Sequence, residues 1–317
     1  AASSDVVEAL TTTIKEMPYS ELAKEKLCEY VTNITTSGHL SNFINLILEY
    51  AKLIELYGAF QVSNMIEQFN DEKSGALSAT AEQNTIVSNY FNVDHNKTIF
   101  SSRIGRGSEV LSLLKEGLSN EIYGQDFSPN DLVIAEVRFY LQGTANVHLK
   151  EANILMEQAF EGMTFDYAYD TPRFGYKPQS EYEAMQKDSR FNYFGVPGRM
   201  NADLGFVVAA MHQLNDKGKG AFYVTTGALS RSGADAKIRQ RLIMSDCIEA
   251  TIEFPAGLYA PIAGIGSVLL LVNKAKRAEA KNTVLFINAA TLVETQRRKA
   301  VLTEEGVQLI SEILAER

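Results

Sequence analysis

The chain has 317 residues, a net charge of −9 and a hydrophobic fraction of 45%, which is enough apolar material for a full buried core. The acidic balance argues against a free-standing nucleic-acid-binding protein, because phosphate contacts need clustered Lys and Arg side chains. It leaves open a subunit whose partner supplies the basic surface.

Cysteine and histidine usage bears on compartment and metal binding. Cys28 and Cys247 lie far apart and form no CxxC motif, which is typical of a reduced, cytoplasmic protein. The four histidines have no metal-ligand spacing, so we expect no metal site. No apolar run reaches the roughly 18 residues of a membrane span, and the N-terminus lacks a signal-peptide pattern.

The first 70 residues are predicted to be helical. Leu40–Tyr57 has the strongest pattern, because its apolar residues recur at i, i+3 and i+4 spacing. We expect this region to form a helical bundle or a cap against the main domain. The stretch 71–83 is polar and rich in small residues, so we place a domain boundary there, with a helical segment at 1–74 and an α/β domain at 75–317.

From residue 98 onward, predicted strands alternate with helices. This alternation implies a mostly parallel sheet with helices on both faces. The last strands follow one another without a helix, which predicts an antiparallel pair at one edge. The predicted strands are Thr98–Ser101, Glu121–Asp126, Val147–Leu149, Phe165–Tyr169, Gly220–Thr225, Ile248–Phe254, Gly266–Asn273 and Val284–Asn288. A helix capped by Thr80 and running through Phe91 is predicted before the first strand. The later predicted helices are Glu109–Leu118, Pro129–Gln142, Asp203–Leu214, Ala234–Ser245 and Thr303–Leu314.

A glycine turn follows the first predicted strand of the α/β domain, and an acid ends the second. The turn contains Gly105 and Gly107, and Asp126 follows 19 residues after Gly107. In nucleotide-binding sheets such glycines let the backbone approach the ligand, while the acid binds the ribose diol. On these residues alone, a plain turn and a solvated Asp126 remain the alternative.

The order of these segments resembles the methyltransferase (M) subunit of type I restriction–modification systems. The resemblance runs from about residue 75 to 288, through IYGQDFSPNDLVIAEVRFYLQG at 122–143, the segment 191–243, IEATIEFPAGLYAPIAGIGSVLLLVNK at 248–274 and VLFINA at 284–289. It implies a doubly wound, Rossmann-like sheet and an N6-adenine DNA methyltransferase that uses S-adenosylmethionine. It also implies a specificity subunit as partner, with a second M-like subunit as a further candidate, and DNA bound through the assembly.

The cofactor positions depart from the family pattern. The family's D-P-x-x-G-S-G loop reads SSRIGRG at 101–107, so the leading acid and proline are serines and Arg106 adds a cation. The family's G-D-x-L, whose acid contacts the cofactor's adenine, aligns with ANIL at 152–155. By resemblance, the residues that would bind S-adenosylmethionine are Gly105, Gly107, Asp126 and Asn153.

The catalytic loop departs further. The family's N-P-P-F/Y reads Thr171-Pro172-Arg173-Phe174. In the family, the Asn oxygen and a Pro carbonyl accept hydrogen bonds from the flipped adenine's amine, and the aromatic ring stacks on the base. Pro172 can supply a carbonyl and Phe174 can stack, but Thr171 has only a short hydroxyl. Losing one oriented polar group typically costs about 10²–10³ in rate.

Two hypotheses follow from these departures. The first is a degenerate subunit that keeps an assembly role with lost or much reduced catalysis, and the replaced residues favour it. The second is an active but divergent DNA adenine methyltransferase.

Arg231 and Lys237 belong to a loop and helix that, by resemblance, face the substrate. We expect them to contact DNA phosphate groups. A solvated helix face is the alternative.

Overall fold

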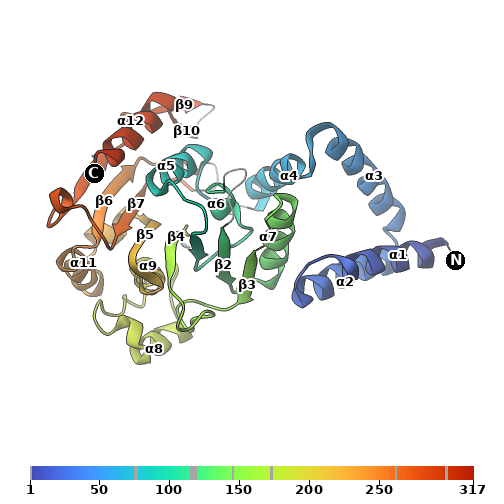
Figure 1. The fold of residues 1–317 in the computed structure, drawn as a ribbon, viewed down its shortest axis with the longest axis horizontal. Helices are drawn as coiled ribbons and strands as arrows, with labels where there is room; N and C mark the ends of the chain where they lie inside the picture. Colours follow the sequence, from blue (N-terminus) through green and yellow to red (C-terminus); the bar gives the residue numbers. More distant parts are fainter. Residues whose placement is uncertain are drawn as a thin grey trace.

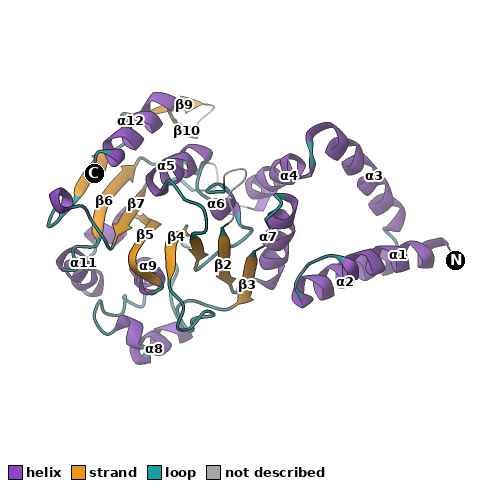
Figure 2. Cartoon of the chain, in the orientation of Figure 1, coloured by secondary structure: helices purple, strands orange, loops and turns teal. Residues whose placement is uncertain are grey.

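The structure of the chain is a computed structural model that describes residues 2–74, 78–114, 120–144, 146–171, 174–260, 263–296 and 299–317. An α/β domain lies on one side of the molecule, and the N-terminal helices extend from it on the other (Figure 1). Figure 2 shows the sheet enclosed by helices within the α/β domain.

One sheet forms the centre of the α/β domain. Within the described residues it has eight strands in the order β3-β2-β1-β4-β5-β7-β6-β8. Neighbouring strands are parallel except at β7, which is antiparallel to both β5 and β6. The predicted parallel sheet with antiparallel pairing among its last strands is therefore confirmed. The strands are β1 Thr98–Ser101, β2 Glu121–Asp126, β3 Val147–Glu151, β4 Phe165–Asp170, β5 Leu214–Thr225, β6 Ile248–Phe254, β7 Ser267–Asn273 and β8 Leu285–Asn288.

Helices cover both faces of this sheet. Side chains alternate between the faces along each strand, so neighbouring residues such as Phe222 and Tyr223 on β5 lie in different cores. One core is closed by α5, α6, α7 and α12, and the other by α8, α9 and α11. These helices are α5 Ala81–Phe91, α6 Ser108–Leu111, α7 Pro129–Leu141, α8 Ser180–Lys187, α9 Asp203–His212, α11 Ala234–Met244 and α12 Glu304–Ala315.

Several element boundaries differ from the predictions. Helix α6 ends at Leu111, and the Leu113 N–H bonds to the Val110 carbonyl oxygen rather than to that of Glu109, which a longer helix would use. The rest of predicted helix Glu109–Leu118 falls partly on residues 115–119, outside the described residues. Strand β5 begins at Leu214, which pairs with Phe165 across a register shift. The elements that the sequence did not predict are α8, α10 Thr226–Ser230, and the antiparallel pair β9 Val293–Gln296 and β10 Lys299–Leu302.

The N-terminal helices contact the α/β domain at α7. The backbone N–H and hydroxyl of Ser20, the residue before α2, donate to the Glu136 carboxylate, and the Tyr19 ring meets Tyr140 edge-on at 5.3 Å. Deeper in the contact, the Arg138 guanidinium donates to Asn64 Oδ1 on α4 at 3.0 Å. The helices are α1 Ala2–Glu16, α2 Glu21–Thr36, α3 Leu40–Tyr57 and α4 Ala59–Ser74. The proposed division at residue 74 stays a prediction.

Helix α3 differs from expectation. Its apolar side chains do not form the interior of a bundle or cap, since no residue of α3 is buried. Ile47, Leu48 and Ile54 are 38%, 55% and 41% exposed. The periodic pattern predicted the helix correctly, but α3 lies away from the sheet (Figure 1), and apolar residues such as Leu46, Leu48 and Leu56 are exposed.

The sequence predicted neither a membrane span nor a metal site. In the part that the structure describes, no helix is long and apolar enough to cross a membrane. Nor do its His, Cys, Asp and Glu side chains gather in groups of three or more that could hold a metal ion.

Candidate cofactor and catalytic site

The glycine turn after β1 has the backbone shape that requires glycine. Gly105 and Gly107 have φ values of +50° and +82°, in the left-handed region that side chains disfavour. A Cβ at Gly107 would also lie 3.0 Å from the Phe139 ring of α7. The loop is therefore folded tightly between β1 and α7.

Asp126, at the end of β2, lies beside this turn. Its Oδ2 accepts a hydrogen bond from the Gly105 N–H at 3.0 Å, and its Oδ1 accepts from the Ser128 N–H at 3.0 Å. The residue is 3% exposed. Burial raises the pKa of Asp126, against the opposing effects of the Arg103 charge and these amides. The sequence placed Asp126 correctly next to the glycines, but the carboxylate binds the glycine loop itself.

Asn153 lies beyond the end of β3 and is tied to α8. Its Oδ1 accepts from the Leu155 N–H at 3.1 Å, and its Nδ2 donates to Glu181 Oε1 at 3.2 Å. Glu181 also accepts from the Tyr176 hydroxyl at 2.6 Å and from the Gln179 N–H at 2.9 Å. Both polar atoms of Asn153 thus have partners within the protein.

These contacts decide how well the residues fit an adenosyl cofactor. A ribose diol needs an accessible carboxylate, and the Asp126 carboxylate is buried and bonded to two backbone amides. An adenine amine needs an acceptor, and the Asn153 oxygen, which accepts from the Leu155 N–H, keeps a second lone pair for one. In this conformation the glycine turn keeps its shape, but the Asp126 carboxylate would have to become accessible before it could bind the ribose of S-adenosylmethionine.

Arg106 lies between the two glycines, and its side chain forms an ion pair with a residue of α7. Its Nε lies 3.0 Å from the Asp131 carboxylate, in the first turn of that helix. The cation that the sequence placed beside the cofactor position is therefore paired with an acid.

Asp170, the last residue of β4, was missed by the sequence analysis. Its buried carboxylate accepts hydrogen bonds from the hydroxyls of Ser101 and Ser102 at 2.7 and 2.6 Å, and from the Arg103 N–H at 3.1 Å. Burial raises the pKa of Asp170, while these donors oppose the rise. An acid ending a strand next to a Ser-Ser pair was the available signal, but it depends on knowing that β1 and β4 are neighbours.

Thr171, at the catalytic position, is held from two sides. Its hydroxyl lies 3.0 Å from Glu109 Oε1, and its carbonyl oxygen accepts from Arg103 Nη1 at 3.1 Å. The same Glu109 oxygen accepts from the Ala79 N–H at 3.2 Å. A carboxylate only accepts hydrogen bonds, so the Thr171 hydroxyl is the donor in its contact. Pro172 and Arg173 lie outside the described residues.

Phe174 packs onto the protein rather than projecting from the loop. It is half-buried against one of the two cores, and its ring lies 5.8 Å from that of Tyr259. Tyr259 is itself buried and hydrogen-bonded to Gln83 and Ser267. In this conformation the Phe174 ring therefore contacts an aromatic side chain of the protein.

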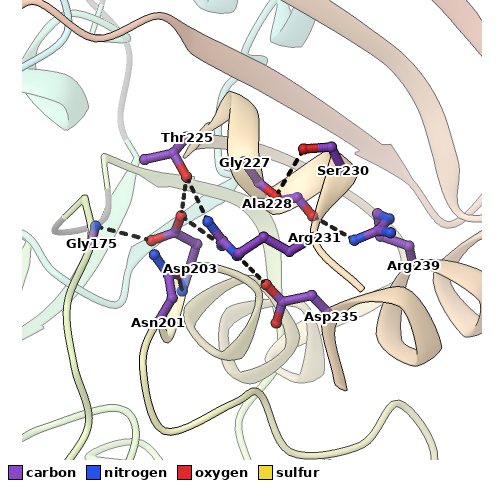
Figure 3. A network of polar contacts seen from close by, with 10 residues as sticks. All are labelled: Gly175, Asn201, Asp203, Thr225, Gly227, Ala228, Ser230, Arg231, Asp235 and Arg239. Atoms are coloured by element: carbon purple, nitrogen blue, oxygen red, sulfur yellow. Dashed lines mark hydrogen bonds and ion pairs between the residues drawn. The ribbon is translucent and has the colours of Figure 1, made fainter. Parts of the chain in front are cut away.

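Arg231 forms part of a buried polar network next to the catalytic loop (Figure 3). Its Nη2 and Nε donate to Asp203 at 3.2 Å and Asp235 at 2.6 Å. Asp203 is fully buried at the start of α9, and it also accepts from the Thr225 hydroxyl and, at 3.4 Å, from the Gly175 N–H. The network connects the basic loop to the chain just after the catalytic position.

Lys237 has a different environment, because its side chain is exposed on α11. The structure thus separates the two predicted DNA-contacting residues into one in a salt-bridge network and one on the surface. Their contact with phosphate stays a prediction.

Comparison with known proteins identifies the family. The family model of the N-6 DNA methylases matches residues 108–317, about two thirds of the chain. The chain belongs to the N-6 DNA methylase family. Its predicted resemblance is thereby confirmed at the family level.

Individual relatives agree with this family assignment. The chain is 29% identical over 228 residues to the MjaIX methylase subunit, a type I restriction enzyme subunit of Methanocaldococcus jannaschii, covering 67% of this chain and 40% of that protein. It is 23% identical over 234 residues to the MpnII methylase subunit of Mycoplasma pneumoniae, covering 67% and 42%. The chain therefore spans about 40% of the length of these curated relatives.

Solved structures agree on the fold. The methyltransferase subunit of a type I restriction–modification system from Streptococcus thermophilus superposes with a TM-score of 0.72 at 21% identity, covering 80% of this chain and 56% of that one. A class I S-adenosylmethionine-dependent methyltransferase from Listeria monocytogenes gives 0.64 at 18% identity, covering 99% and 97%. The class I methyltransferase fold predicted from the sequence is confirmed.

Proposed function

We propose that this chain serves in a type I restriction–modification assembly as a methyltransferase-fold subunit whose own methyl transfer is lost or much reduced. The observation that carries this proposal is the contact between Thr171 and Glu109. By resemblance, N6-adenine transfer needs a hydrogen-bond acceptor at position 171, and the Thr171 hydroxyl acts as a donor to Glu109.

The chemistry of the amine explains the weight of this contact. The amine of a flipped adenine carries hydrogens, and accepting them makes N6 a better nucleophile. The Thr171 hydroxyl donates its hydrogen to Glu109, and the Thr171 carbonyl is occupied by Arg103. The Thr171 hydroxyl oxygen retains lone pairs. However, a Thr side chain does not reach as far as an Asn amide, and the hydroxyl is already oriented by Glu109. We expect a loss of about 10²–10³ in rate from this position alone.

The cofactor half of the site supports the same proposal. S-adenosylmethionine would supply the methyl group, with Gly105, Gly107, Asp126 and Asn153 as its expected contacts. The Asp126 carboxylate is 3% exposed and bonded to two backbone amides of the chain, so cofactor binding at this residue would require the surrounding loop to open and exchange contacts. That exchange weakens binding by the cost of the contacts that it breaks.

The second candidate function is an active but divergent DNA adenine N6-methyltransferase. The glycine turn favours it, because Gly105 and Gly107 keep left-handed conformations next to Asp126. The Arg106 side chain pairs with Asp131, which compensates the charge that would repel a sulfonium.

The proposed partners come from the relatives, whose names describe methylase subunits of type I restriction enzymes. We expect a specificity subunit to be the partner that selects the DNA sequence, and a second M-like chain is a further candidate partner. We expect the assembly to be cytoplasmic. The uncovered apolar side chains of α3 support contact with a protein partner, since helices with this much exposed Leu and Ile seldom remain free.

Titration calorimetry and methyl transfer test the proposal together. Purified chain is titrated with S-adenosylmethionine and with S-adenosylhomocysteine, and methylation of adenine in DNA is measured with the specificity subunit present. We expect no binding up to millimolar ligand and no transfer. Micromolar binding without transfer would show that the cofactor site is functional and that only catalysis is lost. Transfer by the unmodified chain would overturn the proposal, and Thr171→Asn should then increase the rate.

A further inference from the structure

The buried carboxylate of Asp170 lies where the two loops of the candidate site meet. Strands β1 and β4 are adjacent and parallel, so Ser101 and Asp170 end the two strands side by side. The carboxylate accepts from the hydroxyls of Ser101 and Ser102 and from the N–H of Arg103. Three consecutive residues, the last of β1 and the first two of the loop that follows it, thus bind one acid from β4.

The rest of the loop is held from its other side. The Ile104 N–H donates to the Gln125 carbonyl at 3.0 Å, and the Gly105 N–H donates to Asp126 at 3.0 Å. The loop 101–107 is therefore fixed between β4 and β2. On the β4 side, the backbone N–H of Arg103 in this loop donates a hydrogen bond to the Asp170 side chain.

The position of Ser101 gives this contact a further meaning. By resemblance, the family has an acid at position 101, where this chain has serine. The Ser101 hydroxyl lies 2.7 Å from Asp170 Oδ1, so a carboxylate on either strand would reach nearly the same place. A buried carboxylate is costly unless donors surround it. Two hydroxyls, one amide and the nearby Arg103 charge provide this compensation.

We infer that Asp170 is a positioning residue that holds the loop 101–107 in its shape, in place of an acid at position 101. The acid lies on β4, the neighbour of β1, and the loop geometry that keeps Gly105 beside Asp126 depends on it. The inference goes beyond the proposed function, because it applies whether or not the chain binds a cofactor or transfers a methyl group.

Hydrogen–deuterium exchange of the whole chain tests the inference without any ligand. In Asp170→Ala, amides within 102–107 should exchange at least about tenfold faster. The variant removes a buried charged acceptor that holds the loop closed, so the loop opens more easily. Adding Ser101→Asp to Asp170→Ala should restore most of the protection. Ser101→Asp alone should raise the exchange rate, because it places two carboxylates together.

The matched control is Asp166, at the opposite end of β4. It binds the same neighbouring strand, accepting from the N–H and hydroxyl of Thr98 at 3.0 Å each. Asp166→Ala should leave exchange within 102–107 unchanged. Equal acceleration in Asp166→Ala and Asp170→Ala would show a general loss of stability and overturn the inference.

Two further outcomes would also overturn it. One is unchanged loop exchange in Asp170→Ala, and the other is failure of Ser101→Asp to restore protection. If Asp170→Ala does not fold, Asp170→Asn takes its place, because the amide keeps one acceptor oxygen and the same shape. It should show a smaller acceleration confined to the loop, and no acceleration would count against the inference.

Discussion

The Arg231 guanidinium pairs with the fully buried carboxylate of Asp203, with 3.2 Å between Nη2 and Oδ2. These residues come from the start of α9 and the loop after α10, and Asp203 also receives the Gly175 N–H of the catalytic loop (Figure 3). Arg231 therefore stabilises the fold next to the site, independently of any contact with DNA.

We predict that Arg231→Ala lowers the free energy of unfolding by about 1–3 kcal/mol, because it leaves a buried acid with fewer donors. The Arg231 side chain is 33% exposed, so solvent keeps the loss below that of a fully buried pair. Urea unfolding measures the difference. Lys237→Ala, on the exposed face of α11, is the control and should stay within about 0.5 kcal/mol of the parent. Equal stability of all three proteins would contradict the importance of the pair.

DNA contact is better tested at Lys237, since its side chain is exposed and we expect its removal to leave the fold intact. In the assembly with a specificity subunit, Lys237→Ala should weaken DNA binding. It should also reduce the slope of log affinity against log salt by about 0.9, the value for one lost phosphate contact. Affinity is measured at several salt concentrations. An unchanged slope would favour the alternative, a solvated helix face.

Glu181 gives a pH-dependent prediction. Burial raises the pKa of Glu181. Hydrogen bonds from Tyr176, Gln179 and Asn153 lower it and together outweigh the effect of burial, so the pKa lies below its ordinary value. A lowered folded-state pKa stabilises the fold above the unfolded pKa of about 4.3, and this stabilisation is lost as the pH falls through the folded value.

We therefore expect Glu181→Gln to lose stability relative to the parent at about pH 6, and expect the difference to shrink toward about pH 3. Unfolding by urea at several pH values measures it. Glu183→Gln on the same helix is the control, because Glu183 is exposed. A difference that stays constant with pH would show that the carboxylate charge is unimportant there.

Local patterns predicted most of the fold. Strands β1, β2 and β6 lie where the sequence placed them, because short apolar runs between turn residues specify buried strands. Glycine conformation and strand-end position also brought Gly105 and Asp126 together correctly. These features depend on residues close in sequence or on the general geometry of parallel sheets.

The missed features depend on side chains that are distant in sequence. The spacing of basic residues did not reveal that Arg231 pairs with Asp203, 28 positions earlier. Similarly, Thr171 and Glu109 are 62 positions apart, and their contact requires α6 and the loop after β4 to be neighbours. Periodicity shows which residues share one face of a helix, but not what covers that face.

Helix α3 allows a test of that last point. Leu48 and Leu56 are 55% and 74% exposed, so Leu48→Glu and Leu56→Glu should each change the free energy of unfolding by less than about 0.5 kcal/mol. Val62 on α4 is 3% exposed, and Val62→Glu should cost at least about 2 kcal/mol, because it buries a charge. If α3 contacts the specificity subunit, both leucine variants should fold normally yet fail to copurify with that co-expressed subunit. Full copurification of the double variant would remove α3 from the interface, and a large loss of stability would show that its apolar face is covered within the chain.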